Sequence, residues 1–471
     1  MRPDSRPPRA PPAGLDEPLP TPRQSQDRVS WRRLAPCIVL AAAVWLAAPG
    51  PAALRSGLAL FALVAGLWTT QAVPLAATAL LVPLLSTATG LQQPEAALAP
   101  FAHPIVFLFL GGFALAAALR RHGLGQSLAA TAMRAARGRL GVSIVLLAGV
   151  TALLSLWMSN TAAAVVMLPL AVGLIDARRD AMGPREQAFV VLAVTYSTAL
   201  GGMASIVSTP PNTLAAALSG AEFLEWFARV APLSILLWLA MLGILYATLR
   251  PRLAAVVDIE PLHFRWTSGS RWTAVIFVFT VAGWAAGAPL GRLVGIETNM
   301  HAVVALAAIA ALIITRAIAW RELEQDVQWS VLLLFGGGLA LSEAMTASGS
   351  ASFLVQQLLA VLQGVPRMLV LLAIVAFIVV LSELMSNTAS AALALPLFMP
   401  LAPSIGLSPV AMAAAIALAA SCGFMLPVAT PPNALAFGTG RVDQASMMRC
   451  GWKLDAACIL LITAAAHWAW T

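Results

Sequence analysis

The chain has 471 residues, of which 60% are hydrophobic and 10% are charged, and its formal net charge at pH 7 is +8. A soluble domain carries about 25% charged residues, so this composition excludes a soluble enzyme, a disordered protein and a disulfide scaffold. Apolar runs without the alternation of barrel strands recur from residue 34 onward, which predicts an all-α polytopic membrane protein.

The N-terminal part of the chain is polar before it becomes apolar. Residues 1–33 are rich in Pro and Arg and have almost no apolar periodicity, so we expect a disordered cytoplasmic tail. Residues 34–53 predict the first transmembrane helix, although a basic flank before an apolar run also fits a signal peptide. Because a span needs about 20 residues, the apolar segments together predict about 11 transmembrane helices.

The apolar stretch 140–178 is too long for one membrane crossing and too short for two crossings with a turn. Arginines flank both of its ends, and basic flanks mark the cytoplasmic side of a membrane. Its middle carries the polar break Ser159-Asn160-Thr161, and irregular backbone at that depth is tolerated only where it is buried or lines a cavity. We therefore predict a re-entrant hairpin that enters from the cytoplasm, turns at this break and returns.

The next apolar segment, 186–218, is long enough to span and contains the motif Thr209-Pro210-Pro211-Asn212. Two prolines remove two N–H donors and break a helix, which leaves the preceding carbonyls without their usual partners. Carbonyl oxygens that face a cavity suit a small hard cation. This motif therefore predicts a broken transmembrane helix and a candidate ion site.

The same motifs recur in the second half of the chain. Residues 155–170 and 382–397 match at 10 of 16 positions, including Ser386-Asn387-Thr388 at the second polar break. Thr430-Pro431-Pro432-Asn433 repeats the proline motif, and Gly337-Gly338 repeats Gly111-Gly112. These recurrences predict two repeats. We assign repeat 1 to 54–250, a cytoplasmic linker to 251–270 and repeat 2 to 271–471, with the second hairpin at 366–403 and the second broken helix at 408–440.

The second hairpin has almost no charged flank, so we expect it to enter from the side opposite to the first. Inverted-topology repeats with broken helices are typical of secondary transporters, and the breaks mark a binding site near the membrane midplane. The topology assigns the N-terminus and 24 of the 28 basic residues to the cytoplasmic side. We expect the protein in a bacterial inner membrane.

The two Ser-Asn-Thr tips favour an anion, because a helix start supplies N–H groups and a partial positive charge. Neither hairpin core contains Arg or Lys, so amides, hydroxyls and dipoles would hold the anion. Glu383 is an intramembrane carboxylate, which makes it either a functional candidate or a group paired inside its hairpin. Each motif alone fits a cap or a kink, but the paired recurrence favours a functional site.

The tips, the breaks and the stretch 69–85 resemble the divalent anion:sodium symporter family, which comprises sodium-coupled di- and tricarboxylate carriers. The resemblance implies a homodimer in which a mobile transport domain moves against a scaffold by an elevator motion. The chain departs from the family pattern at Ser208, where Gly is usual, and at Gln71, where Glu is common.

The resemblance also implies the residues of two sodium sites and of the substrate site. The first sodium site would comprise Ser155, Ser159, Asn160 and the backbone near Ser208, and the second Ser382, Met385, Asn387 and the backbone near Ala429. The substrate carboxylates would meet Asn160, Thr161, Asn387 and Thr388, with Pro211 and Pro432 close by.

We therefore expect sodium-coupled symport of C4-dicarboxylates such as succinate, malate and fumarate, or of related di- and tricarboxylates, with Na⁺ as the coupling ion. The alternative is a sodium-independent dicarboxylate or sulfate exchanger of the same fold. A membrane-embedded enzyme is disfavoured because the sequence has neither HExxH nor GxSxG. The expected partners are the anion, the lipid bilayer and a second copy of the chain, and no nucleic acid.

Overall fold

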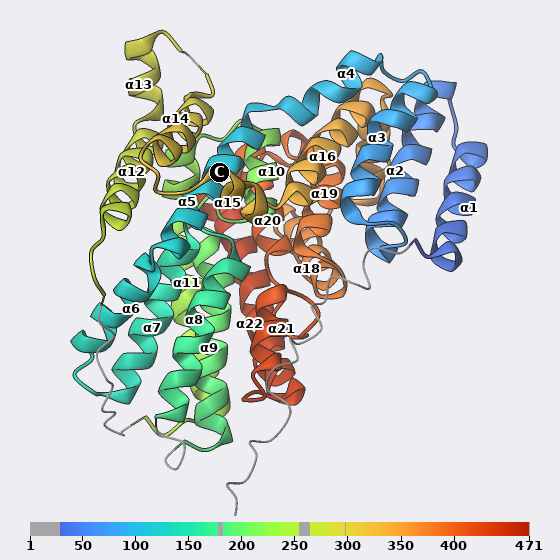
Figure 1. Cartoon of the computed structure of the whole chain (residues 1–471). Helices are drawn as coiled ribbons and strands as arrows, with labels where there is room; N and C mark the ends of the chain where they lie inside the picture. The colour runs from blue at the N-terminus through green and yellow to red at the C-terminus, as the bar shows by residue number, and fades with distance from the viewer. Residues whose placement is uncertain (1–28, 178–181, 254–263, 297, 471) are drawn as a thin grey trace, which may run out of the picture.

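The computed structural model describes residues 29–177, 182–253, 264–296 and 298–470, and every regular element in these ranges is a helix (Figure 1). The expected all-α fold is thereby confirmed. Most of the predicted tail lies outside these ranges, and its last residues already belong to helix α1 (Trp31–Ala47).

Helices α1 to α11 make up the first half of the chain, and α12 to α22 make up the second. After α1 the first half continues with α2 Ala52–Thr70, α3 Leu75–Ala88, α4 Pro94–Leu98, α5 Pro104–Arg121, α6 Leu124–Ala135, α7 Leu140–Ser155, α8 Asn160–Asp176, α9 Pro184–Gly202, α10 Pro210–Ser219 and α11 Phe223–Leu249. The second half comprises α12 Ser268–Ala285, α13 Gly287–Val294, α14 Met300–Ile314, α15 Trp320–Asp326, α16 Trp329–Ala347, α17 Ser350–Val361, α18 Arg367–Leu384, α19 Asn387–Phe398, α20 Pro409–Ala420, α21 Pro431–Gly438 and α22 Gln444–Ala464. Short 3₁₀ turns occupy Ala99–Ala102, Met399–Leu401 and Pro403–Ile405, and a π-helical turn, Ala465–Ala469, follows α22.

Six helical segments of the described residues are long and apolar enough to cross a membrane. They are Ala52–Thr70, Pro94–Arg121, Phe223–Leu249, Trp329–Ala347, Arg367–Leu384 and Gln444–Ala469. Shorter apolar helices accompany them, among them α7, α8 and α19 in the two predicted hairpins. The total of about 11 spans, which rests on segment length, stays a prediction.

Two helix boundaries differ from the expected ones, and both differences have local causes. Helix α1 ends at Ala47 although the predicted span runs to residue 53, because Pro49 and Pro51 flank Gly50, which has φ 92°. Helix α12 begins at Ser268, ahead of the predicted start of repeat 2. The side chains of Thr267 and Ser270 form a capping box there, with N–H to oxygen distances of 3.1 and 2.8 Å.

Two short helices, α6 and α17, were not predicted from the sequence. Each follows a glycine in the left-handed conformation, Gly123 with φ 65° before α6 and Gly349 with φ 75° before α17. A left-handed residue reverses the chain direction after the preceding long helix. The two helices therefore occupy equivalent places in the two halves, directly after α5 and α16 and before the predicted hairpins.

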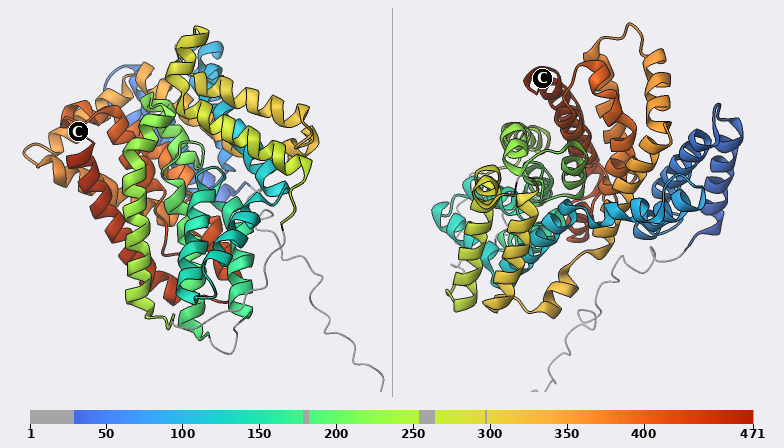
Figure 2. Two further views of the ribbon diagram at one scale, coloured as in Figure 1. Left: turned by 90° about the vertical axis from the view of Figure 1, so that its left-hand side faces the viewer. Right: turned by 90° about the horizontal axis from the view of Figure 1, so that it is seen from above.

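The two halves pack against each other reciprocally. Helix α5 packs on α14, and α16 packs on α3, while α1 to α3 and α12 to α14 lie at opposite ends of the molecule (Figures 1 and 2). A Cβ on Gly111 would lie 2.6 Å from Cβ of Ala305, and a Cβ on Gly337 would overlap Cβ and Cα of Ala79. Gly111 and Gly337 are 226 positions apart in the chain, and so are Ala79 and Ala305. The two contacts therefore occupy equivalent positions in the two halves.

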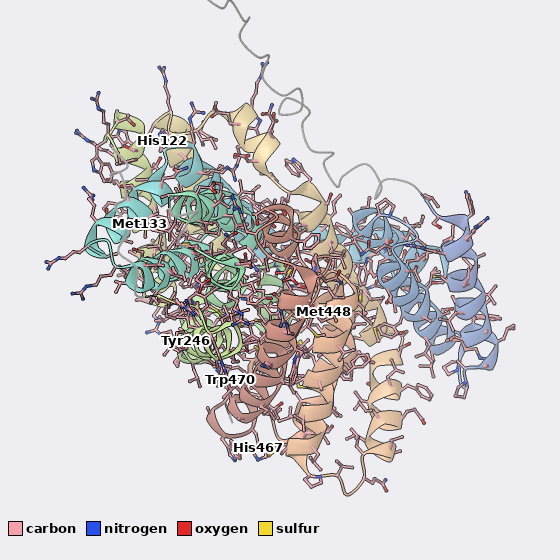
Figure 3. The ribbon with its side chains drawn as sticks, turned by 90° about the horizontal axis from the view of Figure 1, so that it is seen from below. His122, Met133, Tyr246, Met448, His467 and Trp470 are labelled. Carbon is pink, nitrogen blue, oxygen red and sulfur yellow. The ribbon has the colours of Figure 1, made fainter. Side chains whose placement is uncertain are left out.

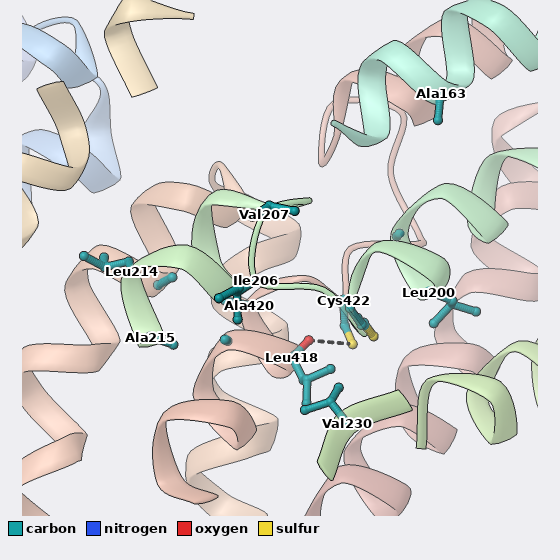
Figure 4. Close-up of a cluster of buried hydrophobic side chains, with 14 of the residues drawn as sticks. Ala163, Leu200, Ile206, Val207, Leu214, Ala215, Val230, Leu418, Ala420 and Cys422 are labelled. Carbon is teal, nitrogen blue, oxygen red and sulfur yellow. Dashed lines mark hydrogen bonds between the residues drawn. The ribbon is translucent and has the colours of Figure 1, made fainter. Parts of the chain in front are cut away.

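The core continues between the broken helices. Figure 4 shows Leu200 and Leu214 from the first half in one buried cluster with Leu418 and Cys422 from the second. The Cys422 thiol lies 3.2 Å from the carbonyl oxygen of Leu418 in the preceding helical turn. All four cysteines of the chain are buried and free, so they pack as small apolar side chains.

Candidate substrate and ion site

The first Ser-Asn-Thr motif lies where one helix ends and another begins. Helix α7 ends at Ser155 and α8 begins at Asn160, with Ser159 as the N-cap residue. The Ser159 hydroxyl accepts a hydrogen bond from the Ala162 amide at 3.3 Å. The other early N–H groups of α8 have no partner within the helix, so they can donate to a ligand.

Ser155 connects this tip to the next helix. Its Oγ lies 3.0 Å from Oδ1 of Asn160 and 2.6 Å from the carbonyl oxygen of Thr198 in α9. Ser155 is fully buried, whereas Asn160 is half-buried. The Ser155 hydroxyl thus lies within hydrogen-bonding distance of one oxygen of the tip and one carbonyl oxygen of the broken helix.

The first Thr-Pro-Pro-Asn motif starts α10 after the break that follows Gly202, and Thr209 is the N-cap residue of that helix. Nδ2 of Asn212 donates to the carbonyls of Gly202, Met203 and Ser205 at 3.1, 2.9 and 2.9 Å. Several carbonyls that the proline motif was expected to leave open are therefore bonded by Asn212. Oδ1 of the same side chain is buried and accepts no hydrogen bond from the described residues.

The second half repeats this geometry. Oγ of Ser382 lies 2.9 Å from Oδ1 of Asn387 and 2.6 Å from the carbonyl oxygen of Ala420 in α20. Nδ2 of Asn433 donates to the carbonyls of Gly423 and Leu426 at 2.8 and 3.0 Å. The remaining motif residues take the same places as in the first half: Ser386 and Thr430 are the N-cap residues of α19 and α21, and Pro431 begins α21.

Two glycines show which predicted ligands lie together. A Cβ on Gly202 would lie 2.5 Å from Oγ of Ser208 and 2.7 Å from Oδ1 of Asn160, so only glycine fits between these groups. The equivalent Gly423 is less crowded, because its Cβ would lie 3.4 Å from Ala429 and 3.6 Å from Oδ1 of Asn387. The structure thus brings Asn160 to Ser208 and Asn387 to Ala429.

The substrate-side candidates lie at the starts of four helices that pack across the two halves. Helix α10 packs on α19, and α21 packs on α8. Each proline motif therefore lies on a helix that contacts the Ser-Asn-Thr helix of the other half. The half-buried side chains at these starts include Asn160, Thr161, Asn387 and Thr388, whereas Pro211, Pro432 and Met385 are buried.

Glu383 bonds outside its own hairpin. Its Oε1 accepts a hydrogen bond from the Met425 amide at 2.8 Å, and its Oε2 accepts one from the Leu426 amide at 3.2 Å. Both amides belong to the break between α20 and α21. The corresponding position in the first half is Leu156, so this carboxylate contact belongs to the second half alone.

Two buried polar side chains near the second break were missed by the sequence motifs. The Tyr196 hydroxyl donates to the Phe424 carbonyl at 2.7 Å, which ties α9 to the second break. Asp455 on α22 is 5% exposed and lies beside Glu383. A lone carboxylate in an apolar helix is the signal that marks Asp455 in the sequence.

Comparisons with known proteins indicate transport. A citrate transporter family model, CitMHS, matches residues 65–417. A Haemophilus influenzae protein named uncharacterized transporter is 38% identical over 423 residues, which cover 88% of this chain and 92% of that protein. The Staphylococcus saprophyticus protein named sodium-dependent dicarboxylate transporter SdcS is 31% identical over 435 residues, which cover 84% of this chain and 82% of that protein.

A solved structure shares the fold. The YdaH transporter of Alcanivorax borkumensis aligns with a TM-score of 0.56 at 18% identity, over 79% of this chain and 87% of that chain. The family model and the two relatives each cover most of this chain. The chain therefore belongs to the citrate transporter family, within the divalent anion:sodium symporters, and it is an integral membrane transporter.

Proposed function

We propose that this transporter is a secondary active carrier that couples sodium to the uptake of C4-dicarboxylates or related di- and tricarboxylates. The observation that carries the proposal is the matching pair of serines, Ser155 and Ser382, each of which bonds to the Asn of its own tip and to a carbonyl oxygen of the broken helix. The relative named sodium-dependent dicarboxylate transporter supports the same ion and substrate class. The carrier would work as a homodimer by an elevator motion.

The proposed carrier would hold sodium at two sites, and their donors would be hard oxygens of the kind that small cations prefer. Near the first site, Oδ1 of Asn212 is a buried acceptor that a cation would compensate electrostatically. The first site would use Ser155, Ser159, Asn160 and the backbone at Ser208, and the second Ser382, Met385, Asn387 and the backbone at Ala429.

The anion would bind between the two tips. The N–H groups at the starts of α8 and α19 would face its carboxylates together with Thr161 and Thr388, with Pro211 and Pro432 at the edges of the site. Asn160 and Asn387 would serve both ligands, because Oδ1 faces the ion site while Nδ2 can donate to a carboxylate. An amide shared in this way makes anion affinity depend on sodium, which is the coupling that symport requires.

The test replaces each shared amide. We expect Asn160→Ala and Asn387→Ala to abolish sodium-driven succinate uptake in proteoliposomes. Thr151→Val is the matched control, because Thr151 is buried on the same helix as Ser155 and its hydroxyl bonds only to Leu147 one turn earlier. Undiminished uptake in either Asn variant would refute the site.

Sodium dependence is tested in the same proteoliposomes. Concentrative uptake that requires a sodium gradient supports symport. Counterflow of labelled dicarboxylate that proceeds equally well in choline would instead support the sodium-independent exchanger, and it would leave the anion part of the site in place.

A further inference from the structure

A cavity of about 820 Å³ lies at the end of the molecule remote from the Ser-Asn-Thr tips. It is open to the surface and is lined by the start of α9, the end of α11 and the turn from α21 into α22. None of the residues proposed for the ion and substrate sites lines it. The cavity is therefore a separate feature, and what it binds does not depend on the proposed function.

The cavity is strongly basic. Five basic residues line it, Arg185, Arg250, Arg441, Arg449 and Lys453, against one carboxylate, Asp443. Asp443 accepts a hydrogen bond from the Ser446 amide at 3.3 Å as the N-cap of α22, and hydrogen bonds from Ser446 lower its pKa below the usual value, so it stays ionised. Arg441 is paired with Asp176, and Asp443 alone cannot balance the other four cations, so the cavity attracts an anion.

Some of these cations already have partners, and others are exposed. Arg441 bonds to Asp176 at 2.5 Å, and the Lys453 ammonium lies 3.1 Å from the Thr248 hydroxyl. Arg185, Arg250 and Arg449 are exposed and come from three different helices or their ends. An anion in the cavity would therefore join α9, α11 and α22.

The surface beside the cavity has the character of a membrane interface. Tyr246 and Trp452 are 55% and 53% exposed on α11 and α22, and Lys453 lies 6.0 Å from the centre of the Trp452 ring. Figure 3 looks onto this end of the molecule, with Tyr246 and Met448 labelled. Tyr and Trp concentrate at membrane interfaces, and all five lining cations belong to segments that the sequence assigns to the cytoplasmic side.

We propose that this cavity binds the phosphate group of an anionic phospholipid from the cytoplasmic leaflet. Basic pockets between transmembrane helices on this side suit anionic headgroups. Arg185, Arg250, Arg449 and Lys453 hold the phosphate, and Tyr246 and Trp452 lie beside the acyl chains. The bound lipid joins the ends of three helices at this face.

The test measures lipid retention by native mass spectrometry on full-length protein exchanged into detergent containing phosphatidylglycerol or phosphatidylcholine. The double variant Arg185→Gln, Arg449→Gln removes two headgroup contacts, and at about 1 kcal/mol per basic residue we expect phosphatidylglycerol binding to weaken about 30-fold. The control Arg265→Gln, Arg271→Gln loses the same charge at exposed positions outside the cavity and keeps its lipid.

Three outcomes would overturn the proposal. One is equal retention of phosphatidylglycerol by the cavity variant and the control variant, and another is equal retention of phosphatidylcholine by the unaltered protein. A third is displacement of the lipid by soluble glycerol phosphate at matched concentration, which would assign the site to a free anion. If the first double variant fails to fold, Arg250→Gln, Lys453→Gln removes the other two contacts and tests the same expectation.

Discussion

At the scale of single residues, Asn212 and Asn433 hold the two helix breaks together. Nδ2 of Asn212 lies within hydrogen-bonding distance of three carbonyls and Nδ2 of Asn433 of two. Because an amide NH₂ has two hydrogens, each side chain makes about two full hydrogen bonds, and at about 1 kcal/mol each we expect Asn212→Ala and Asn433→Ala to lower the free energy of unfolding by about 2 kcal/mol. Thermal unfolding in detergent should show a similar loss for both variants, with Thr151→Val close to the unaltered protein. A midpoint of thermal unfolding equal to that of the unaltered protein, for either Asn variant, would contradict this account of the breaks.

Glu383 shows what the local sequence can and cannot predict about a single residue. A carboxylate in an apolar hairpin is visible in the sequence and predicts a functional or paired group. Its partners, the amides of Met425 and Leu426, lie 42 and 43 positions further along the chain. No local pattern encodes that contact, because it depends on how α18 packs beside the second break. The same holds for Tyr196, whose partner Phe424 is 228 positions away.

At the scale of helices, the glycine contacts between the halves leave no room for a methyl group. Gly337→Ala would force α16 away from the backbone of Ala79, and Gly111→Ala would push α5 from Ala305. Overpacking of this kind costs about 1–3 kcal/mol, so both variants should unfold at lower temperature. Gly243→Ala on α11 is the control, because no heavy atom lies within 4 Å of its added Cβ, and it should gain about 0.5–1 kcal/mol. Equal midpoints of thermal unfolding for Gly337→Ala and Gly243→Ala would show that α16 can move away from Ala79 without loss of stability.

Helix ends were predictable where the residues themselves stop a helix. Prolines at 210 and 431 begin α10 and α21, and the polar triplets separate α7 from α8 and α18 from α19. The short helices α6 and α17 escaped prediction because their 12 residues each are too few for a span. Their positions depend on left-handed glycines, which the sequence does not distinguish from the many other glycines of the chain.

At the scale of the whole molecule, the reciprocal contacts relate the two halves. Helix α5 on α14 corresponds to α16 on α3, and α10 on α19 corresponds to α21 on α8. Each half thus supplies one tip and one break. The helix that follows each break packs on the helix that begins at the tip of the other half. If the halves are inverted in the membrane, both tips reach the same depth from opposite sides, which is the arrangement that alternating access requires.

The inverted topology can be tested by cysteine labelling, because the four native cysteines are buried and contribute little background. Arg139 precedes α7 and Gln363 precedes α18, and both side chains are exposed. We expect an impermeant maleimide to label Gln363→Cys in intact cells and Arg139→Cys only after permeabilisation, because basic flanks stay in the cytoplasm. Labelling of both variants from the same side would rule out opposite entry of the two hairpins. The tips would then approach from one face, and the matching contacts of Ser155 and Ser382 would need another explanation.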